Sequence, residues 1–295
     1  MPAATAPAPS PRESWLLIFN CQVLGLSNSL SLGSDAIRLE HHDPGNFRKA
    51  ASEVLERWDS FDRVLIAPQL LSLLPEAQRD DPKVWKVPTI AFNAYHPDIC
   101  YLQLEGKPLK GPMSDYHSAI AYAAWQLDWS LERTIEAFEA RTYEALGYLD
   151  RWDGAKRALF DRFAAEGWDI APHFARWTRS ADAFMYSINH VDVHCLRDLA
   201  HDILRRAGMP VAQEYIAPHD NLRNGPMYPV YPEIAARLGV RGSMHFKVGG
   251  EYRFIRLPQF VQESFETYRR HPEATVNPEH AATVANARTL LEART

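Results

Sequence analysis

Cys21 is the residue of this sequence that is best placed to act as a nucleophile. It follows the apolar run Ser14 to Phe19 and stands between Asn20 and Gln22. A thiol between a strand and a helix lies near the positive end of the helix dipole, which predicts a lowered pKa and a reactive thiolate. Thiolates attack carbonyl and thioester carbons, and the amides of Asn20 and Gln22 could stabilise the resulting oxyanion. The alternative is a buried, inert cysteine, which is what most free cysteines are, and the polar neighbours Asn20 and Gln22 weaken that alternative.

A second candidate is the sequence His96-Pro97-Asp98. Pro97 restricts the backbone, so the two ionisable side chains are held in a stiff loop. A histidine near a thiol can take its proton, and a carboxylate can orient the imidazole ring. The alternative is a turn with a surface histidine and a capping aspartate.

Two further segments carry polar groups at the starts of predicted helices. His190 follows Asn189 and lies four residues before His194, a spacing that places both rings on one helix face. Val191 breaks the metalloprotease motif, so we expect no metal there. The other segment is Tyr116-His117-Ser118, where hydroxyls and backbone amides at a helix start could hold a phosphate. The alternatives are structural histidines and ordinary helix capping.

These residues need a sheet to bring them together. We expect strands at Ser14–Phe19, 36–39, 61–67 and 87–92, with helical segments between them. Alternating strands and helices are typical of parallel β-α-β units, whose functional groups gather at the carboxyl ends of the strands. Cys21 follows the first predicted strand, and His96 and Asp98 follow the fourth, which predicts that they share one edge.

The remainder of the chain is predicted to be mostly helical. Helical spacing covers residues 116–127, 131–146, 155–165, 190–207, 258–270 and 278–293. A β pair is expected at 246–248 and 252–255, joined by Gly249-Gly250. We therefore expect an Ala- and Pro-rich disordered tail at 1–13 and a single α/β domain at 14–295. Its parts are a sheet-forming part at 14–112, a helical part at 113–210, and a loop, β pair and terminal helices at 211–295.

Composition excludes several classes of protein. Apolar residues make up 46% of the 295 residues and charged residues 23%, which is ordinary for a chain with a real core. The net charge of −5 argues against nucleic acid as a partner. No apolar run is long enough to insert into a membrane. Three widely spaced cysteines argue against a disulfide framework and against a zinc site, and they suit a cytoplasmic location.

The motifs in this order resemble the WcbI family of bacterial capsular polysaccharide biosynthesis enzymes. The matching pieces run from about Trp15 to about Lys247. They are Asn20-Cys21-Gln22, Tyr95-His96-Pro97-Asp98, Asp115-Tyr116-His117-Ser118, Leu146-Gly147-Tyr148, Phe184-Met185-Tyr186-Ser187-Ile188-Asn189-His190 and Tyr228-Pro229-Val230-Tyr231-Pro232. The chain departs from the family at Val191, where a proline is frequent.

The resemblance implies a coenzyme A-binding acyltransferase, with acetyl-CoA as cosubstrate and a sugar, nucleotide-sugar or polysaccharide hydroxyl as acceptor. It also implies a flavodoxin-like sheet similar to that of the SGNH hydrolases, with Cys21 where those enzymes carry serine. Two alternatives stay open. A cysteine-based esterase or thioesterase would pass the acyl group to water, and a non-catalytic protein would bind coenzyme A or a nucleotide sugar without turnover.

On this hypothesis Cys21 accepts the acyl group or anchors the thiol side of the transfer. His96 is the general base, oriented by Asp98, and His190 is the alternative base. Direct transfer without an acyl-enzyme is equally compatible.

The hypothesis also assigns residues that bind the substrates. Gln22 and Asn93 donate to the oxyanion. Coenzyme A carries several phosphates, and the residues that we expect to bind it are Asn20, Tyr116, His117 and Ser118, followed by Arg223 and Lys247.

Overall fold

The computed structural model of the protein describes residues 12–213, 216 and 218–294. Contacts divide the chain into two compact units. The first unit contains the described residues up to Thr89, together with Ala165–Trp168 and Val193–Asn221. The second contains Ile90–Ala164, Asp169–Asp192 and the described residues from Leu222 onward.

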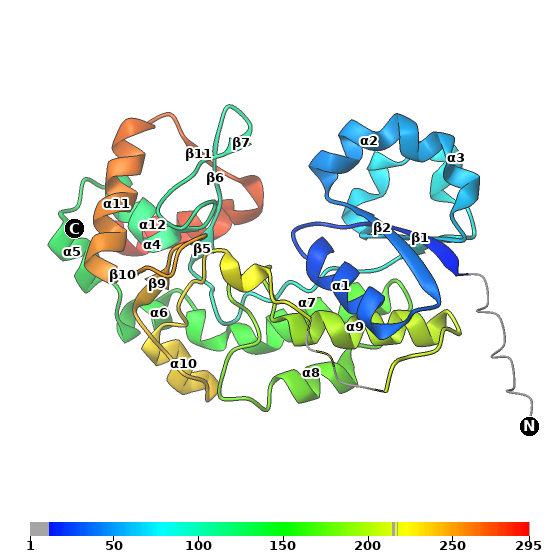
Figure 1. The fold of residues 1–295 in the computed structure, drawn as a ribbon. Helices are drawn as coiled ribbons and strands as arrows, with labels where there is room; N and C mark the ends of the chain where they lie inside the picture. The colour runs from blue at the N-terminus through cyan, green and yellow to red at the C-terminus, as the bar shows by residue number, and fades with distance from the viewer. Residues whose placement is uncertain (1–11, 214–215, 217, 295) are drawn as a thin grey trace, which may run out of the picture. The chain divides into compact units, whose positions relative to one another are not determined.

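The first apolar run of the sequence forms an inner strand of a parallel sheet. Strand β1 (Glu13–Ile18) pairs in parallel with β2 (Ile37–His42) on one side and with β3 (Arg63–Ile66) on the other. The full order is β2-β1-β3-β4, with β4 at Val84–Lys86. Figure 1 labels β1 and β2 of this sheet. The prediction of a parallel sheet in the N-terminal third is therefore confirmed.

Both faces of β1 are buried, as the continuous apolar run predicts. Leu16 and Ile18 belong to one core with Phe47 and Val54 of helix α2 (Pro44–Glu56). The alternate residues of β1, including Leu17, point to the other face because successive strand side chains alternate, and Leu17 is fully buried as well.

Helix α1 (Val23–Gly33) packs against helix α9 (Val193–Arg206) within the first unit. The close approach depends on a glycine, because a Cβ at Gly25 would lie 2.5 Å from Cδ1 of Leu196. The sequence placed α9 in a separate helical part, yet it belongs to the sheet unit. The other elements of this unit are η1 (Trp58–Ser60), η2 (Pro68–Leu73) and α3 (Glu76–Arg79).

The fourth strand lies earlier in the chain than predicted. It ends at Lys86, and Val87 N still donates to Ile66 O at 2.9 Å, but Pro88 has no amide hydrogen with which to continue the ladder. The predicted strand at 87–92 is therefore wrong. His96 and Asp98 do not follow a strand of this sheet; they belong to the second unit. Their proximity to Cys21 stays a prediction.

The second unit is mostly helical, with short strands. Its helices are α4 (Ala119–Gln126), α5 (Leu131–Glu136), α6 (Ala140–Ala145), η3 (Tyr148–Asp150), α7 (Arg151–Ala164), α8 (Ala171–Trp177), η4 (Leu222–Asn224), α10 (Pro232–Leu238), α11 (Leu257–Arg270), η5 (Pro278–His280) and α12 (Ala281–Glu292). Its strands are β5 (Ile99–Cys100), β6 (Leu102–Leu104), β7 (Lys107–Pro108), β8 (His117–Ser118), β9 (His245–Lys247), β10 (Phe254–Arg256) and β11 (Thr275–Val276).

Most of the helices predicted after the sheet-forming part are present, but they begin or end at other residues than predicted. The predicted helix at 131–146 is two helices, because Glu139 between α5 and α6 has an extended backbone. The helix expected from residue 190 begins at Val193. The predicted β pair is confirmed: β9 and β10 are antiparallel, and Gly250 in their connection has a φ of +72° that suits glycine.

The predicted parts of the chain do not coincide with the two units. Residues 1–11 of the expected tail lie outside the described residues, and Glu13 already belongs to β1. That residues 14–295 act as a single domain stays a prediction. Within the described residues, no helix combines the length and apolar character needed to cross a membrane.

The contact between α1 and α9 yields a stability prediction. Gly25→Val would place a branched side chain against fully buried Leu196, and overpacking of this kind costs about 1–3 kcal/mol of unfolding free energy. Asn28→Val, at an exposed position of the same helix, is the matched control. Urea denaturation of both variants measures the difference; equal stabilities would contradict the packing described for Gly25.

Candidate functional site

The chain turns sharply between β1 and α1, and Cys21 stands in this turn. Asn20 closes it twice: its Oδ1 accepts from Gln22 N at 3.0 Å, and its carbonyl accepts from Val23 N at 2.9 Å. Gln22 is fully buried whereas Cys21 is exposed. The turn therefore buries its glutamine and presents its thiol at the carboxyl end of an inner strand, beside the amino terminus of α1.

The thiol is not activated at rest. Although Cys21 is exposed to solvent, the protein atoms around the sulfur desolvate it and raise its pKa from 9.0 to about 11. Backbone amides of Cys21 and Gln22 favour the thiolate, but by less than desolvation disfavours it. The predicted lowering of this pKa is therefore wrong, and the group is a thiol at neutral pH that must lose its proton before it can attack.

Of the two predicted oxyanion donors, Gln22 is buried and Asn93 is exposed. The backbone amide of Gln22 already donates to Asn20, and the Gln22 side chain is buried. Asn93 is exposed in the second unit, where its carbonyl accepts from His96 N at 3.1 Å. Their roles toward an oxyanion stay predictions.

His96 is buried with a basic nitrogen that the fold does not use. Its side chain is 2% exposed, and Nε2 lies 2.9 Å from the carbonyl oxygen of Tyr228, which can only accept, so the proton is on Nε2. Nδ1 then carries a lone pair and has no hydrogen-bond partner among the described residues. The backbone of Ser187 lies near the ring and favours its protonated form, which raises the pKa of His96. Desolvation lowers the pKa of His96 to about 4, so the ring is neutral at pH 7.

Asp98 does not orient His96 directly, contrary to the prediction. Its Oδ1 accepts from Ile120 N at 3.0 Å and from the Tyr148 hydroxyl at 3.2 Å, and its Oδ2 accepts from the Tyr231 hydroxyl at 2.8 Å. Burial raises the pKa of Asp98 to about 6, and these donors oppose the rise. Asp98 thus anchors the start of α4 and two tyrosines.

The prediction that Tyr116, His117 and Ser118 bind a phosphate is wrong, because their side chains are buried and form hydrogen bonds within the protein. His117 is fully buried, with Nε2 3.0 Å from Leu109 O, and desolvation lowers its pKa to about 4. Ser118 is fully buried and caps α4 through Ala121 N. The Tyr116 hydroxyl donates to Asn189 Oδ1 at 2.6 Å.

His190 lies in a turn before α9 rather than on the helix. Its amide donates to Ser187 Oγ at 3.1 Å, and its ring meets that of Tyr116 edge-on at 5.4 Å. Gly225 lies so close that an added Cβ would be 3.2 Å from His190 Cε1. The predicted pairing of His190 and His194 on one helix face is therefore wrong, whereas His190 as a base stays a prediction.

One cavity of the second unit brings together residues that the sequence singled out separately. We call it the His96 cavity; it has a volume of about 400 Å³. It contains His96 together with Arg223 and Lys247, the two cations that we expected to bind phosphate. Its other lining residues are Asp182, Ala183, Met185, Tyr186, Asp192, Met227, Tyr228, Pro229, Val230, Arg241, Ser243, His245 and Phe254.

Lys247 braces the loop that carries Arg223. It is 7% exposed, and its Nζ lies 3.0 Å from Gly225 O, 3.4 Å from Asn224 O and 3.5 Å from Val248 O. Its pKa is lowered by desolvation and by the neighbouring charge of Arg223. The cavity therefore concentrates positive charge at one place.

Sequence reasoning did not find Asp182, Asp192 and Arg241 of this cavity. Arg241 forms an ion pair with Asp182, in which Nε lies 2.7 Å from Oδ1. The Tyr186 hydroxyl donates to Asp192 Oδ2 at 3.0 Å. These residues occur in different segments with no local motif, so no sequence signal could have gathered them.

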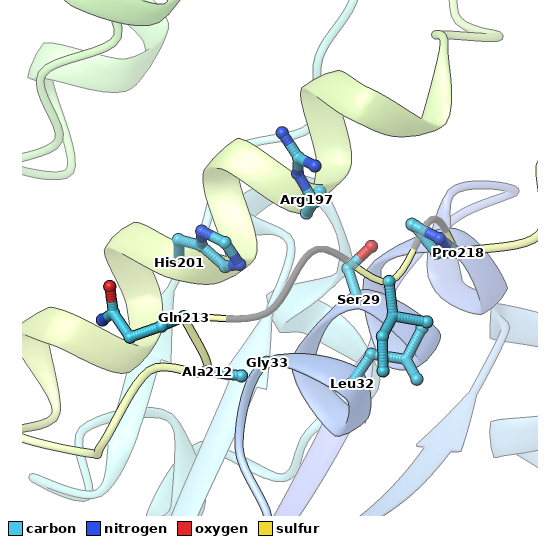
Figure 2. A pocket seen from close by; sticks show the side chains of 9 residues that line it. Ser29, Leu32, Gly33, Arg197, His201, Ala212, Gln213 and Pro218 are labelled. Carbon is cyan, nitrogen blue, oxygen red and sulfur yellow. The ribbon is translucent and has the colours of Figure 1, made fainter.

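A smaller cavity of the first unit lies between α1 and α9. Figure 2 shows Arg197 and His201 on α9, with Ser29 and Leu32 on α1. Its volume of about 150 Å³ is below the roughly 300–1,000 Å³ usual for ligand sites. Cavities of about 630 Å³ beside Trp125 and Arg269 and of about 330 Å³ beside Asp150 and Arg237 fall within that range, but the His96 cavity is the candidate because it contains residues that the sequence singled out. Among residues 12–213, 216 and 218–294, no three His, Cys, Asp or Glu side chains cluster as metal ligands would.

The architecture is shared with a polysaccharide biosynthesis enzyme. A solved structure described as WcbI, a novel polysaccharide biosynthesis enzyme, in native form without a disulfide bond between coenzyme A and one of its cysteines, matches with a TM-score of 0.65. Identity is 16%, and the match covers 96% of this chain and 95% of that chain, which establishes a common fold. No functionally curated protein matches the chain.

The sequence itself carries the family signature. The profile described as polysaccharide biosynthesis enzyme WcbI matches residues 14–212. The chain belongs to the WcbI family of polysaccharide biosynthesis enzymes, and the resemblance noted from its motifs is confirmed.

The buried carboxyl of Asp98 predicts a pH-dependent loss of stability. Its pKa is raised in the folded state, so its stabilising contribution is complete below about pH 3.8 and is lost as the pH rises through about 6. Tyr231→Phe removes a donor to the carboxylate and should cost about 1–3 kcal/mol of unfolding free energy, more at pH 8 than at pH 5. Urea denaturation at both pH values measures this.

Tyr143 supplies the control for that experiment. Its ring stacks on Tyr231 at 5.2 Å, but its hydroxyl is buried without a hydrogen-bond partner among the described residues. Tyr143→Phe should therefore leave stability nearly unchanged at both pH values. Equal losses in the two variants would show that Asp98 does not depend on the Tyr231 hydroxyl.

The raised pKa of Cys21 predicts slow, pH-dependent alkylation. At pH 7 a thiol of pKa about 11 has on the order of a hundredfold less thiolate than one of pKa 9. Iodoacetamide labelling of the native protein, followed by mass spectrometry, should accelerate about tenfold per pH unit from 7 to 9.5 without levelling off. Cys21→Ser should remain unlabelled, because Cys100 and Cys195 are buried. A plateau by pH 8 would refute the raised pKa.

Proposed function

We propose that this protein transfers an acyl group, of the acetyl class, from a coenzyme A thioester to a sugar hydroxyl during polysaccharide biosynthesis. Family membership supports the biosynthetic setting. The description of the solved WcbI structure refers to a disulfide between coenzyme A and a cysteine, which supports a cysteine that meets the coenzyme A thiol. Cys21 is the exposed cysteine of this chain.

The position of Cys21 is the observation that carries the proposal. In the order β2-β1-β3-β4, the connections from β1 and β3 leave in opposite directions along the sheet. Open parallel sheets bind ligands outside the carboxyl ends of the strands at such a switch point. The order agrees with the flavodoxin-like arrangement, and we propose that Cys21 takes the place that serine has in SGNH hydrolases.

In the covalent route, the Cys21 thiol loses its proton to a base and its sulfur attacks the thioester carbon. A new sulfur–carbon bond forms, and coenzyme A leaves as a thiolate that takes up a proton. A sugar hydroxyl then loses its proton and attacks the acyl-cysteine, releasing Cys21. In the direct route, the hydroxyl attacks the coenzyme A thioester. Because the Cys21 pKa is about 11, the covalent route needs a base.

His96 is our proposed base. Its Nδ1 lone pair is available at pH 7 because desolvation keeps the ring neutral down to about pH 4. His190 is the alternative, and Asp98 supports the site by holding the surrounding segments. Asn20, Gln22 and Asn93 stay proposed partners of the donor substrate and its oxyanion. Both substrates of such a reaction can carry phosphates, so Arg223 and Lys247 serve either the donor or the acceptor.

Histidine substitution tests the base. His96→Gln keeps an N–H that can donate to Tyr228 but removes the basic nitrogen, and it should lower acyl transfer roughly 10²- to 10⁴-fold. Transfer is measured as coenzyme A release from acetyl-CoA in the presence of sugar acceptors. His271→Gln, at a partly exposed position just after α11, is the control and should keep full activity. If His190→Gln loses activity while His96→Gln keeps it, His190 is the base.

Cys21→Ala separates the remaining functions. Coenzyme A should raise the melting temperature of both wild type and this variant, and more so at higher concentration, because a ligand stabilises the state that binds it. Only wild type should transfer the acyl group by the covalent route. Coenzyme A release that is independent of the sugar would instead indicate a thioesterase, and binding without release would indicate a non-catalytic protein.

A further inference from the structure

We propose that a cavity of the second unit, lined by residues of α4, α11 and α12, binds a chain of several sugars. We call it the Trp125 cavity, and it shares no lining residue with the His96 cavity. The inference goes beyond the proposed acyl transfer, because binding at this site does not depend on Cys21. The lining residues that carry the argument are Trp125, Gln126, Asp128, Phe265, Arg269 and Arg288.

The walls of the Trp125 cavity are fixed by helix packing. Helix α4 packs against both α11 and α12, and Figure 1 labels all three helices. The Tyr122 hydroxyl of α4 donates to Ala274 O at 2.9 Å, which ties α4 to the segment after α11. The volume of about 630 Å³ is in the range usual for ligand sites. Because the walls are already in place, a ligand does not have to order them.

Trp125 provides an aromatic surface that is held from behind. Its ring stacks on Tyr122 with 5.7 Å between the ring centroids, and it is tilted against Tyr268 at 5.6 Å. The half-buried ring also lines the cavity, and the buried ring of Phe265 adds apolar surface beside it. A fixed aromatic ring of this kind suits the apolar C–H face of a sugar ring.

The polar groups around this surface are of both kinds that sugar hydroxyls need. A hydroxyl donates one hydrogen bond and also accepts, so it needs acceptors and donors. Asp128 supplies acceptors, and Arg269 and Arg288 supply donors. All three are exposed, and none of them forms an ion pair or a side-chain hydrogen bond with another residue of the described ranges. Their polar atoms are therefore available to a ligand.

Asp128 stands where helix stability alone would favour glycine. At the end of α4, Asp128 N donates to Trp125 O at 3.1 Å and Trp129 N donates to Ala124 O at 3.0 Å. This termination puts Asp128 in the left-handed region, with a φ of +53°. Its carboxylate also lies at the negative end of the helix dipole. Strained residues cluster at binding sites, and this one lines the cavity.

A saccharide chain is the occupant that these features favour. The exposed residues Asp128, Arg269, Pro272 and Arg288 open the cavity to solvent, so a chain can continue beyond it. Single-stranded nucleic acid also stacks on aromatic rings, but the net charge of −5 argues against it. Family membership places the protein in polysaccharide biosynthesis, where such chains are at hand.

Binding to defined glycans tests the site in the full-length protein. The probes are an array of oligosaccharide fragments of bacterial capsular polysaccharides, followed by titration calorimetry of the best-bound fragment and of its single sugars. We expect the fragment to bind at least roughly tenfold more tightly than the single sugars. Wild type and Cys21→Ala should bind it equally. An array on which no fragment is bound overturns the inference.

Two substitutions locate the binding. Asp128→Gly and Arg269→Gln should each weaken fragment binding roughly tenfold or more. Asp128→Gly should also raise the melting temperature by about 1–3 °C, because it removes the left-handed strain. A residue with a purely structural role would not combine a higher melting temperature with weaker binding.

Each substitution has a matched control in the second unit. Glu105 is another exposed acidic residue with a left-handed backbone, at a φ of +51°, and it lies outside the cavity lining. Glu105→Gly should raise the melting temperature and leave binding unchanged. Arg270 is exposed beside Arg269 but does not line the cavity, so Arg270→Gln should bind as wild type does.

The outcomes separate this inference from the proposed function. If Asp128→Gly and Arg269→Gln bind the fragment as tightly as wild type, the chain binds elsewhere and the inference is overturned. Displacement of the fragment by coenzyme A would assign the cavity to the acyl donor and overturn it as well. Fragment binding that both substitutions weaken, together with absent acyl transfer in wild type, would contradict the proposed function alone.

Discussion

The buried carboxyl of Asp98 holds the part of the second unit on which the candidate base depends. It accepts hydrogen bonds from the first turn of α4 and from Tyr231. Tyr231 lies three residues after Tyr228, whose carbonyl fixes the proton on Nε2 of His96. Asp98 thus anchors, through the Tyr231 hydroxyl, the segment that also contains the carbonyl of Tyr228.

The two chemical groups of the proposed reaction both rest in their neutral forms, and desolvation contributes to this in each. Desolvation keeps Cys21 protonated and keeps His96 neutral. A neutral thiol and a neutral imidazole are the starting forms that general-base catalysis requires. Neither group relies on the helix dipole that the sequence suggested for Cys21.

The sequence predicts well what depends on local apolar pattern. The strands at β1, β2 and β3, the exposed thiol after β1 and the β9–β10 pair follow from runs of apolar residues and from Gly249-Gly250. The sequence does not predict which residues are buried by contacts with distant segments of the chain. Nothing local indicates that His117 would be enclosed against Leu109, that Pro88 would end the ladder, or that α9 would join the sheet unit.

The site shows the same division. Cys21, His96, Arg223 and Lys247 could be named from residue type, but the cavity that joins the last three depends on chain segments more than a hundred residues apart. Asp98 was predicted to orient His96, but its carboxylate accepts from Tyr148 and Tyr231, which are distant in sequence. Arg241 and Asp182 have no signature, since an ion pair across 59 residues leaves no pattern.

The high pKa of the exposed Cys21 thiol also bears on how the protein ages. Peroxides oxidise thiolates far faster than thiols, so a cysteine that stays protonated is slow to form sulfenic and sulfinic acids. A surface sulfur would otherwise be a weak point of the molecule. Here the desolvation that raises the pKa of Cys21 also protects its sulfur from irreversible oxidation.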